Sequence, residues 1–167
     1  MVTDGRGDAI DRAFGELMRA GVVALRNAGV TQSDGWDEAE QRAETLSDEL
    51  EDEELAYGDG ESDEDPVRGA VFYHAQDLAR ARRGEGLYLT YGAFKRSGRS
   101  RADHDAASVE IGVLAREALA RHGVDVEWNG SVDERLFLPP AAWAAATRRG
   151  VAGAGPGAQR RQASAPK

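Results

Sequence analysis

The stretch GLYLTYGA at residues 86–93 gives the clearest strand signal in the chain. Leu87, Leu89 and Tyr91 alternate with Tyr88 and Thr90, so the two sets point to opposite faces of a strand. Such alternation is typical of a β-strand with one buried face. The rest of the predicted fold is built outward from this strand.

Periodic patterns on both sides predict further elements. They are a strand at 70–73, a short helix at 76–83, a basic loop at 95–104, a helix at 105–122, a hairpin formed by 124–128 and 135–138, and a short helix starting at Pro139-Pro140. Helical connections between the strands at 70–73, 86–93 and 124–128 predict that these three run parallel. The hairpin then adds an antiparallel strand.

The first third of the chain is predicted to be helical. An apolar stripe from Ile10 to Leu25 predicts a helix over 8–28 that ends at Gly29, and a second stripe predicts a helix over 36–55. The loop between them is short, which favours an antiparallel helical hairpin over 8–55.

Together these elements predict an α+β fold in one domain, residues 1–148. The helical hairpin is followed by a mixed sheet of about four strands in β-α-β-α-β-β order with a C-terminal helix, over 67–148. The acidic segment 57–66 is predicted to be a linker, and the basic tail 149–167 to be disordered because it has almost nothing to bury.

Charge is distributed unevenly over the 167 residues. Residues 1–66 contain 5 basic and 20 acidic side chains (−15), and residues 67–167 contain 16 and 10 (+6), which gives the total of −9. An acidic total disfavours nucleic acid as a partner, except at a local patch. The absence of cysteine excludes disulfides and thiolate sites. No secretory signal or membrane span is apparent, so a cytoplasmic location without membrane contact is expected.

Parallel strands would bring their carboxyl ends to one edge, where open sheets commonly bind ligands. The polar residues that follow the three strands therefore form a candidate cleft: His74, Gln76 and Asp77; Lys95, Arg96, Arg99, Arg101 and His104; Trp128 and Asn129. His74 and Asp77 are the catalytic candidates, and the others could hold an anion.

Simpler interpretations exist for each part of this cleft. His74 can simply end a strand with its ring hydrogen-bonded to the backbone, and Asp77 can simply favour a helix N-terminus. The basic loop can be solvated, and Trp128 can pack on the sheet. No metal or cofactor is expected. The acidic run from Asp59 resembles a calcium loop only at its start, because Glu64 replaces the required glycine and Ala70 the bidentate glutamate.

Three phrases carry a resemblance: GVTQSDGW at 29–36, with Asp34, Gly35 and Trp36; FYHAQD at 72–77 with GLYLTYG at 86–92; and VEWNGS at 126–131. They resemble an uncharacterised bacterial family common in actinobacteria, known as a domain of unknown function. A weaker likeness links the acidity and element order to small protein regulators of the bacterial endoribonuclease that starts RNA decay. That likeness implies inhibition through protein contact.

Two functions follow from these observations. The first is a regulatory or protein-interaction domain whose acidic surface binds a basic surface of a protein partner. The alternative is a small-molecule or anion-binding protein, or an enzyme, using the cleft around His74 and Asp77. We rank interaction above catalysis because the sequence contains no catalytic motif, and we keep a homodimer through the apolar helical stripe as a further hypothesis.

Overall fold

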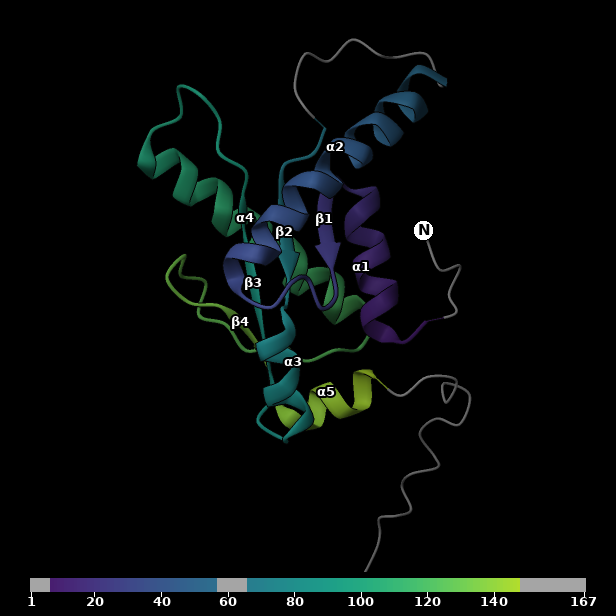
Figure 1. Ribbon diagram of the computed structural model, residues 1–167, viewed down its shortest axis with the longest axis vertical. Coiled ribbons are helices and arrows are strands. Elements are labelled where there is room, and N and C mark those ends of the chain that lie inside the picture. Colours follow the sequence, from purple (N-terminus) through teal and green to yellow (C-terminus); the bar gives the residue numbers. More distant parts are fainter. Residues whose placement is uncertain (1–6, 57–65, 148–167) are drawn as a thin grey trace, which may run out of the picture.

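The computed structural model describes residues 7–56 and 66–147, with the backbone alone at 53–56. These residues form helices α1 (Ala9–Arg19), α2 (Gln32–Ala56), α3 (Ala75–Arg82), α4 (Arg101–Arg121) and α5 (Pro140–Ala146), and strands β1 (Val22–Leu25), β2 (Gly69–Phe72), β3 (Leu87–Ala93) and β4 (Leu136–Leu138) (Figure 1). The strands form one sheet in the order β1-β2-β3-β4. The α+β class and the mixed four-stranded sheet are confirmed.

The helix predicted over 8–28 is wrong in its second half, where β1 lies instead. Helix α1 ends at Arg19, and Gly21 has a φ of +88° that a helix cannot continue. A Cβ at Gly21 would collide with the carbonyl oxygen of Pro66, and Arg68 N donates to Gly21 O at 2.8 Å. The chain therefore turns into a strand parallel to β2, and no helical hairpin forms. A four-residue apolar run cannot be told from buried helix by periodicity.

The predicted parallel pairing of β2 with β3 is also wrong. The two strands run antiparallel, with Gly69 opposite Ala93 and Phe72 opposite Thr90. Helix α3 lies beyond the end of β2 in Figure 1 and contacts the longer strand β3. Because α3 stays at this end of β2, the chain returns beside β2 in the opposite direction.

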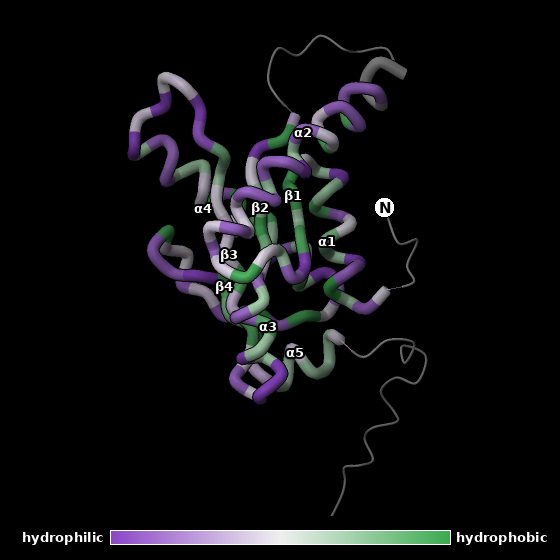
Figure 2. Tube along the Cα trace, in the orientation of Figure 1, coloured by the Kyte–Doolittle hydropathy of each residue, from purple (hydrophilic) through white to green (hydrophobic). Residues whose placement is uncertain are grey.

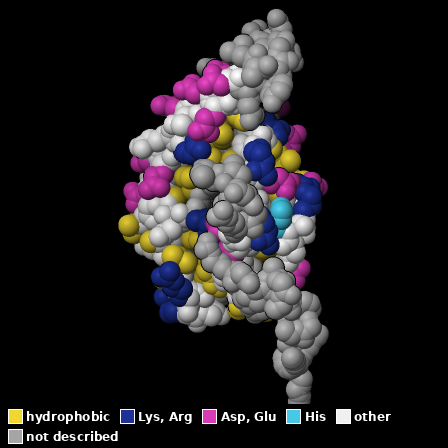
Figure 3. Space-filling view, turned by 90° about the vertical axis from the view of Figure 1, so that its right-hand side faces the viewer, with side chains coloured by type: hydrophobic (Ala, Val, Ile, Leu, Met, Phe, Trp, Pro, Cys, Tyr) yellow, Lys and Arg dark blue, Asp and Glu magenta, His cyan; other side chains and the backbone are white. Residues whose placement is uncertain are grey.

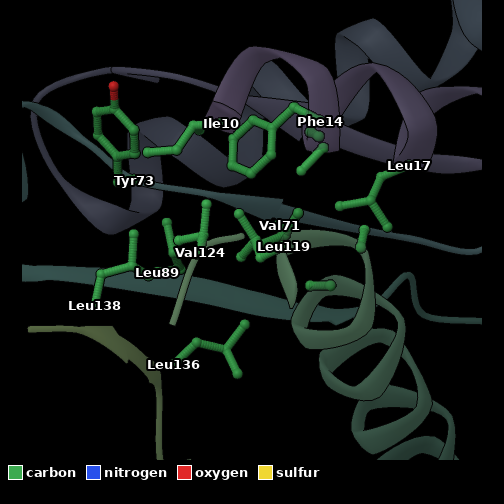
Figure 4. Close-up of a cluster of buried hydrophobic side chains, with 14 of the residues drawn as sticks. Ile10, Phe14, Leu17, Val71, Tyr73, Leu89, Leu119, Val124, Leu136 and Leu138 are labelled. Atoms are coloured by element: carbon green, nitrogen blue, oxygen red, sulfur yellow. The ribbon is translucent and has the colours of Figure 1, made fainter. Parts of the chain in front are cut away.

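The sheet is covered on both faces. Helices α1 and α4 pack on one face, where Ile10, Phe14 and Leu17 of α1 and Leu119 of α4 belong to one buried cluster with side chains of the strands (Figure 4). Helix α2 packs on the other face through Ala39 and Leu46, which meet Val23, Val67 and Ala70. Figure 2 shows the contrast between the apolar strands β1 and β2 and the largely hydrophilic α2.

The last third departs from the prediction in its details. Helix α4 starts at Arg101, because the Ser100 side chain caps it by accepting a hydrogen bond from Asp103 N at 3.0 Å. The predicted loop over 95–104 is therefore shorter. The predicted strand at 124–128 is reduced to a single bridge between Glu127 and Phe137. The predicted linker, apart from Pro66, and the predicted tail lie outside the described residues.

Candidate functional site

The candidate cleft does not form as predicted, because its parts lie at opposite edges of the sheet. The antiparallel pairing puts the carboxyl end of β2, with His74 and Asp77, next to the start of β3. The carboxyl end of β3, which leads to Arg96 and His104, lies next to the start of β2. The structure therefore contains two separate polar regions.

His74 and Asp77 form the cap of helix α3. His74 N donates to Asp77 Oδ2 at 3.3 Å, and Asp77 N donates to His74 Nδ1 at 3.4 Å, which satisfies two backbone groups at once. The imidazole Nε2 also lies 3.2 Å from Asp77 Oδ2. The side chains are 7% and 0% exposed, so a solute cannot reach them without opening the structure.

The buried Asp77 carboxylate joins three elements. Arg80 Nη1, on the same helix, lies 3.5 Å from Oδ1. Arg135, just before β4, places Nη1 3.3 Å from Oδ1 and 3.4 Å from the hydroxyl of Thr90 on β3. A buried carboxylate needs such compensation, since an unpaired charge there is costly. This arrangement supports a structural role for Asp77.

A second, partly buried ion cluster is centred on Arg26, which the sequence did not indicate. Its Nη1 donates to Asp8 at 2.7 Å and to Asp11 at 2.8 Å, and its Nε donates to the Tyr73 hydroxyl at 3.0 Å. Burial alone would lower the pKa of Arg26, but the hydrogen bonds to Tyr73 and Asp8 raise it above its ordinary value. Asp8 and Asp11 also form the capping box of α1, so the cluster ties that helix to the sheet. Only the spacing of the two aspartates, three residues apart at a helix start, could have suggested this cluster.

The other predicted ligand-binding residues have separate local roles. Arg99 donates to Phe94 O at 3.3 Å, and Arg101 is largely exposed beside Asp105. Gln76 is exposed. Asn129 accepts from Ser131 N in a turn at 2.9 Å.

Trp128 packs against the sheet, in agreement with the simpler of its two interpretations. Its ring meets Tyr91 edge-on at 5.4 Å between centroids, and the guanidinium of Arg116 lies 5.1 Å from the ring centroid. The indole N–H donates to the carbonyl oxygen of Glu134 at 3.0 Å.

The Asp34-Gly35-Trp36 motif sets helix α2 against the sheet. Asp34 caps the helix start, because its Oδ2 accepts from Val30 N and Thr31 N, both at 3.2 Å. These backbone hydrogen bonds hold the pKa of Asp34 below its usual range. Gly35 lies so close to the Phe72 ring that a Cβ would collide with it.

Trp36 continues this contact and forms one wall of a cavity. Its ring meets Phe72 at 5.3 Å and Phe94 at 6.1 Å between centroids. The cavity has a volume of about 670 Å³ and lies beside the end of β3, where the basic residues Lys95 and Arg96 enter its lining. This is the second polar region, and it contains Lys95, Arg96 and His104 of the predicted set.

The outward side of α2 is acidic. After Asp34 in the first turn, the exposed carboxylates among the described side chains of α2 are Asp37, Glu38, Glu40, Glu44, Asp48, Glu49, Glu51 and Asp52. Figure 3 shows Asp and Glu side chains on the upper part of the molecule, at the height of α2 in Figure 1. The sequence of α2 contains one basic residue, Arg42, which pairs with Glu49 at 3.4 Å.

Residues 2–147 match the family described as Domain of unknown function (DUF6891). The chain belongs to this family. No curated protein and no solved structure matches the DUF6891 chain. The predicted membership of an uncharacterised domain family is thereby confirmed, and the likeness to ribonuclease regulators stays a prediction. Within residues 7–56 and 66–147 of the DUF6891 chain, no helix is long and apolar enough to cross a membrane.

Proposed function

We propose that this DUF6891 chain is a regulatory protein-interaction domain that binds a basic surface of a protein partner through helix α2. The observation that carries the proposal is a row of four exposed carboxylates at four-residue spacing, which we call the acidic ridge: Glu40, Glu44, Asp48 and Asp52. Residues four apart on a helix are neighbours, so each consecutive pair repels.

Repulsion between neighbouring carboxylates of the acidic ridge destabilises helix α2. Like charges at this spacing destabilise a helix by roughly 0.2–0.5 kcal/mol per pair, whereas alternating signs stabilise it by a similar amount. A partner that places lysine or arginine along the ridge would relieve the repulsion and speed association. Nucleic acid phosphates would be repelled, so a protein is the expected partner.

The enzyme alternative around His74 and Asp77 has less support. Both side chains are buried, and Asp77 is already paired with Arg80 and Arg135. A ligand that used them would have to displace these partners. Binding through exposed groups requires no such rearrangement.

The apolar helical stripe proposed as a homodimer surface is not exposed on α1. The apolar stripe of α1, which includes Ile10, Phe14 and Leu17, is buried against the chain's own core. A homodimer stays a prediction, and it would need a different surface.

The proposal is tested with two matched triple variants. Glu44→Gln/Asp48→Asn/Asp52→Asn neutralises most of the ridge, and Glu110→Gln/Glu117→Gln/Asp125→Asn removes three exposed charges outside α2. Each tagged protein is incubated with native cell extract at low and high salt. We expect the wild type and the control variant to retain partner proteins at low salt. The ridge variant should not retain them, and retention should be lost at high salt. Equal retention by both variants would refute the role of the ridge.

A further inference from the structure

The cavity beside the end of β3 has the size and composition of a small-molecule site. Its volume of about 670 Å³ falls within the ordinary range for ligand pockets, roughly 300–1,000 Å³. It is lined by Trp36, Glu40 and Ala43 of α2, by Val67, by Ala93, Phe94, Lys95 and Arg96 at and after the end of β3, and by His104 of α4. Apart from Glu40, none of these residues belongs to the acidic ridge.

One part of the lining is aromatic and apolar. Trp36 and Phe94 lie 6.1 Å apart between ring centroids with an interplanar angle of 75°, and both are only partly buried. The Trp36 position is fixed by its edge-on contact with Phe72 and by the close approach of Gly92. Two partly exposed rings held in place offer a preformed contact for a flat apolar group.

The other part of the lining is charged. Lys95 is exposed, and Arg96 is oriented by donating from Nη2 to Val67 O at 2.7 Å. The lining thus holds two cationic side chains, Lys95 and Arg96, and one carboxylate, that of Glu40. In a chain whose total charge is −9, a wall with two cationic groups favours a ligand with one negative charge, and the nearby ridge disfavours a ligand with several.

We propose that this cavity binds a small organic anion with one flat ring system and a single anionic group. The ring system packs against Trp36 and Phe94, and the anionic group pairs with Lys95 and Arg96. A carboxylate, a sulfonate or a phosphodiester, each with one negative charge, would meet the charge requirement.

The proposal is tested by fluorescence titration with 8-anilinonaphthalene-1-sulfonate, which combines a flat ring system with one sulfonate. N-phenyl-1-naphthylamine has the same rings without the charge. The wild type is expected to bind the sulfonate saturably, with Kd below about 1 mM, and the neutral compound more weakly. Absence of saturable binding, or equal affinity for the two compounds, would overturn the proposal.

Two variants locate the bound probe. Ala43→Met fills the cavity from a partly buried helix position and is expected to lower the affinity for both compounds at least tenfold. Lys95→Ala is expected to lower the affinity for the sulfonate about threefold and to leave the affinity for the neutral compound unchanged, because a partly solvated ion pair contributes little binding energy. Each variant must keep the wild-type urea midpoint.

Matched controls change the same properties outside the lining. Thr45→Met adds the same side chain at an exposed position of α2, and Arg82→Ala removes one exposed positive charge. Neither should alter the affinity for the sulfonate. If the controls weaken binding as much as Ala43→Met and Lys95→Ala do, the cavity is not the site. The ridge triple variant should bind the probe at least as tightly as the wild type, so failure of the proposed function and failure of this inference are distinguishable.

Discussion

Arg135 Nη1 lies 3.3 Å from Oδ1 of Asp77, and this ion pair joins the start of β4 to helix α3 around a fully buried carboxylate. Replacing Asp77 with Asn keeps the shape but removes the charge that Arg80 and Arg135 compensate. Since both arginines are partly exposed and can rehydrate, we expect a loss of about 2–3 kcal/mol in the free energy of unfolding, below the usual figure for a broken buried pair.

Urea denaturation of the Asp77→Asn variant measures this loss. The control is Asp125→Asn, which removes a carboxylate at an exposed position and should change stability by less than about 0.5 kcal/mol. Similar stabilities for the two variants would contradict the structural role of Asp77.

The charge cluster around Arg26 makes a comparable prediction. Arg26→Gln leaves the buried Asp8 without its cation, so we expect a loss of about 2–4 kcal/mol in urea denaturation. Arg26→Lys should recover only part of this, because one ammonium cannot reproduce the contacts to Asp8, Asp11 and Tyr73. Arg19→Gln, at an exposed position, is the control, and a wild-type-like Arg26→Gln protein would show that the cluster adds no stability.

Two glycine substitutions in helices should have opposite effects, because Gly35 of α2 lies against the sheet and Gly15 of α1 does not. Gly35→Ala forces a Cβ into the Phe72 ring, and we expect a loss of about 1–3 kcal/mol from overpacking. Gly15→Ala in α1 meets nothing closer than 3.7 Å and should stabilise the protein by about 0.5–1 kcal/mol. Thermal and urea unfolding measure both. A neutral Gly35→Ala variant would mean that helix α2 does not sit as closely on β2 as described.

Glu16 predicts a pH dependence of stability. Its hydrogen bond with Arg121 holds the pKa of Glu16 below the ordinary 4.5, against the opposing effect of burial and with further help from His122. A carboxylate with a lowered folded-state pKa stabilises the protein above the unfolded pKa, and this contribution is lost as pH falls through the folded pKa.

Glu16→Gln tests this dependence. The variant should be less stable than wild type at pH 7 by only about 0.2–1 kcal/mol, because the group is largely solvated. The difference should shrink below pH 4.5 as the wild-type carboxyl becomes protonated. Urea midpoints measured at pH 7 and at pH 3 provide the comparison, and a difference that persists unchanged at pH 3 would contradict it.

The acidic ridge predicts a variant that gains stability while losing binding. In Glu44→Gln/Asp48→Asn/Asp52→Asn the repulsion between ridge neighbours is removed, so we expect a gain of about 0.5–1 kcal/mol in the free energy of unfolding. Circular dichroism and urea denaturation at low salt measure it, and the gain should fall as salt screens the wild-type repulsion. A destabilised variant would show that these carboxylates stabilise the fold, which would remove the argument for a functional ridge.

The sequence was sufficient for most elements because their periodicities are long or strongly marked. The alternation in residues 86–93 predicted β3, and the capping and termination signals around 76–84 predicted α3. Strand β1 was missed because Val22–Leu25 is too short and too apolar for its period to be read. The direction of β3 was missed because it depends on where α3 packs, and no local pattern encodes that.

The same limit applied to the candidate site. The polar residues after β2 and β3 were predicted to meet at one edge of the sheet, but the antiparallel pairing separates them. Lys95, Arg96 and His104 do line a cavity, together with Trp36 from a helix about 60 residues earlier in the chain. Long-range contacts of this kind, and the cluster of Arg26 with Asp8, follow from tertiary packing and have no signature in a single sequence.

The central claim is that α2 is the surface through which the chain binds its partner. Hydrogen–deuterium exchange of the full chain, measured alone and with the protein retained in the capture experiment, tests it most directly. We predict slower exchange over residues 37–52 in the complex, with little change in β3 and β4. Unchanged exchange in α2, with protection elsewhere on the sheet, would contradict the claim.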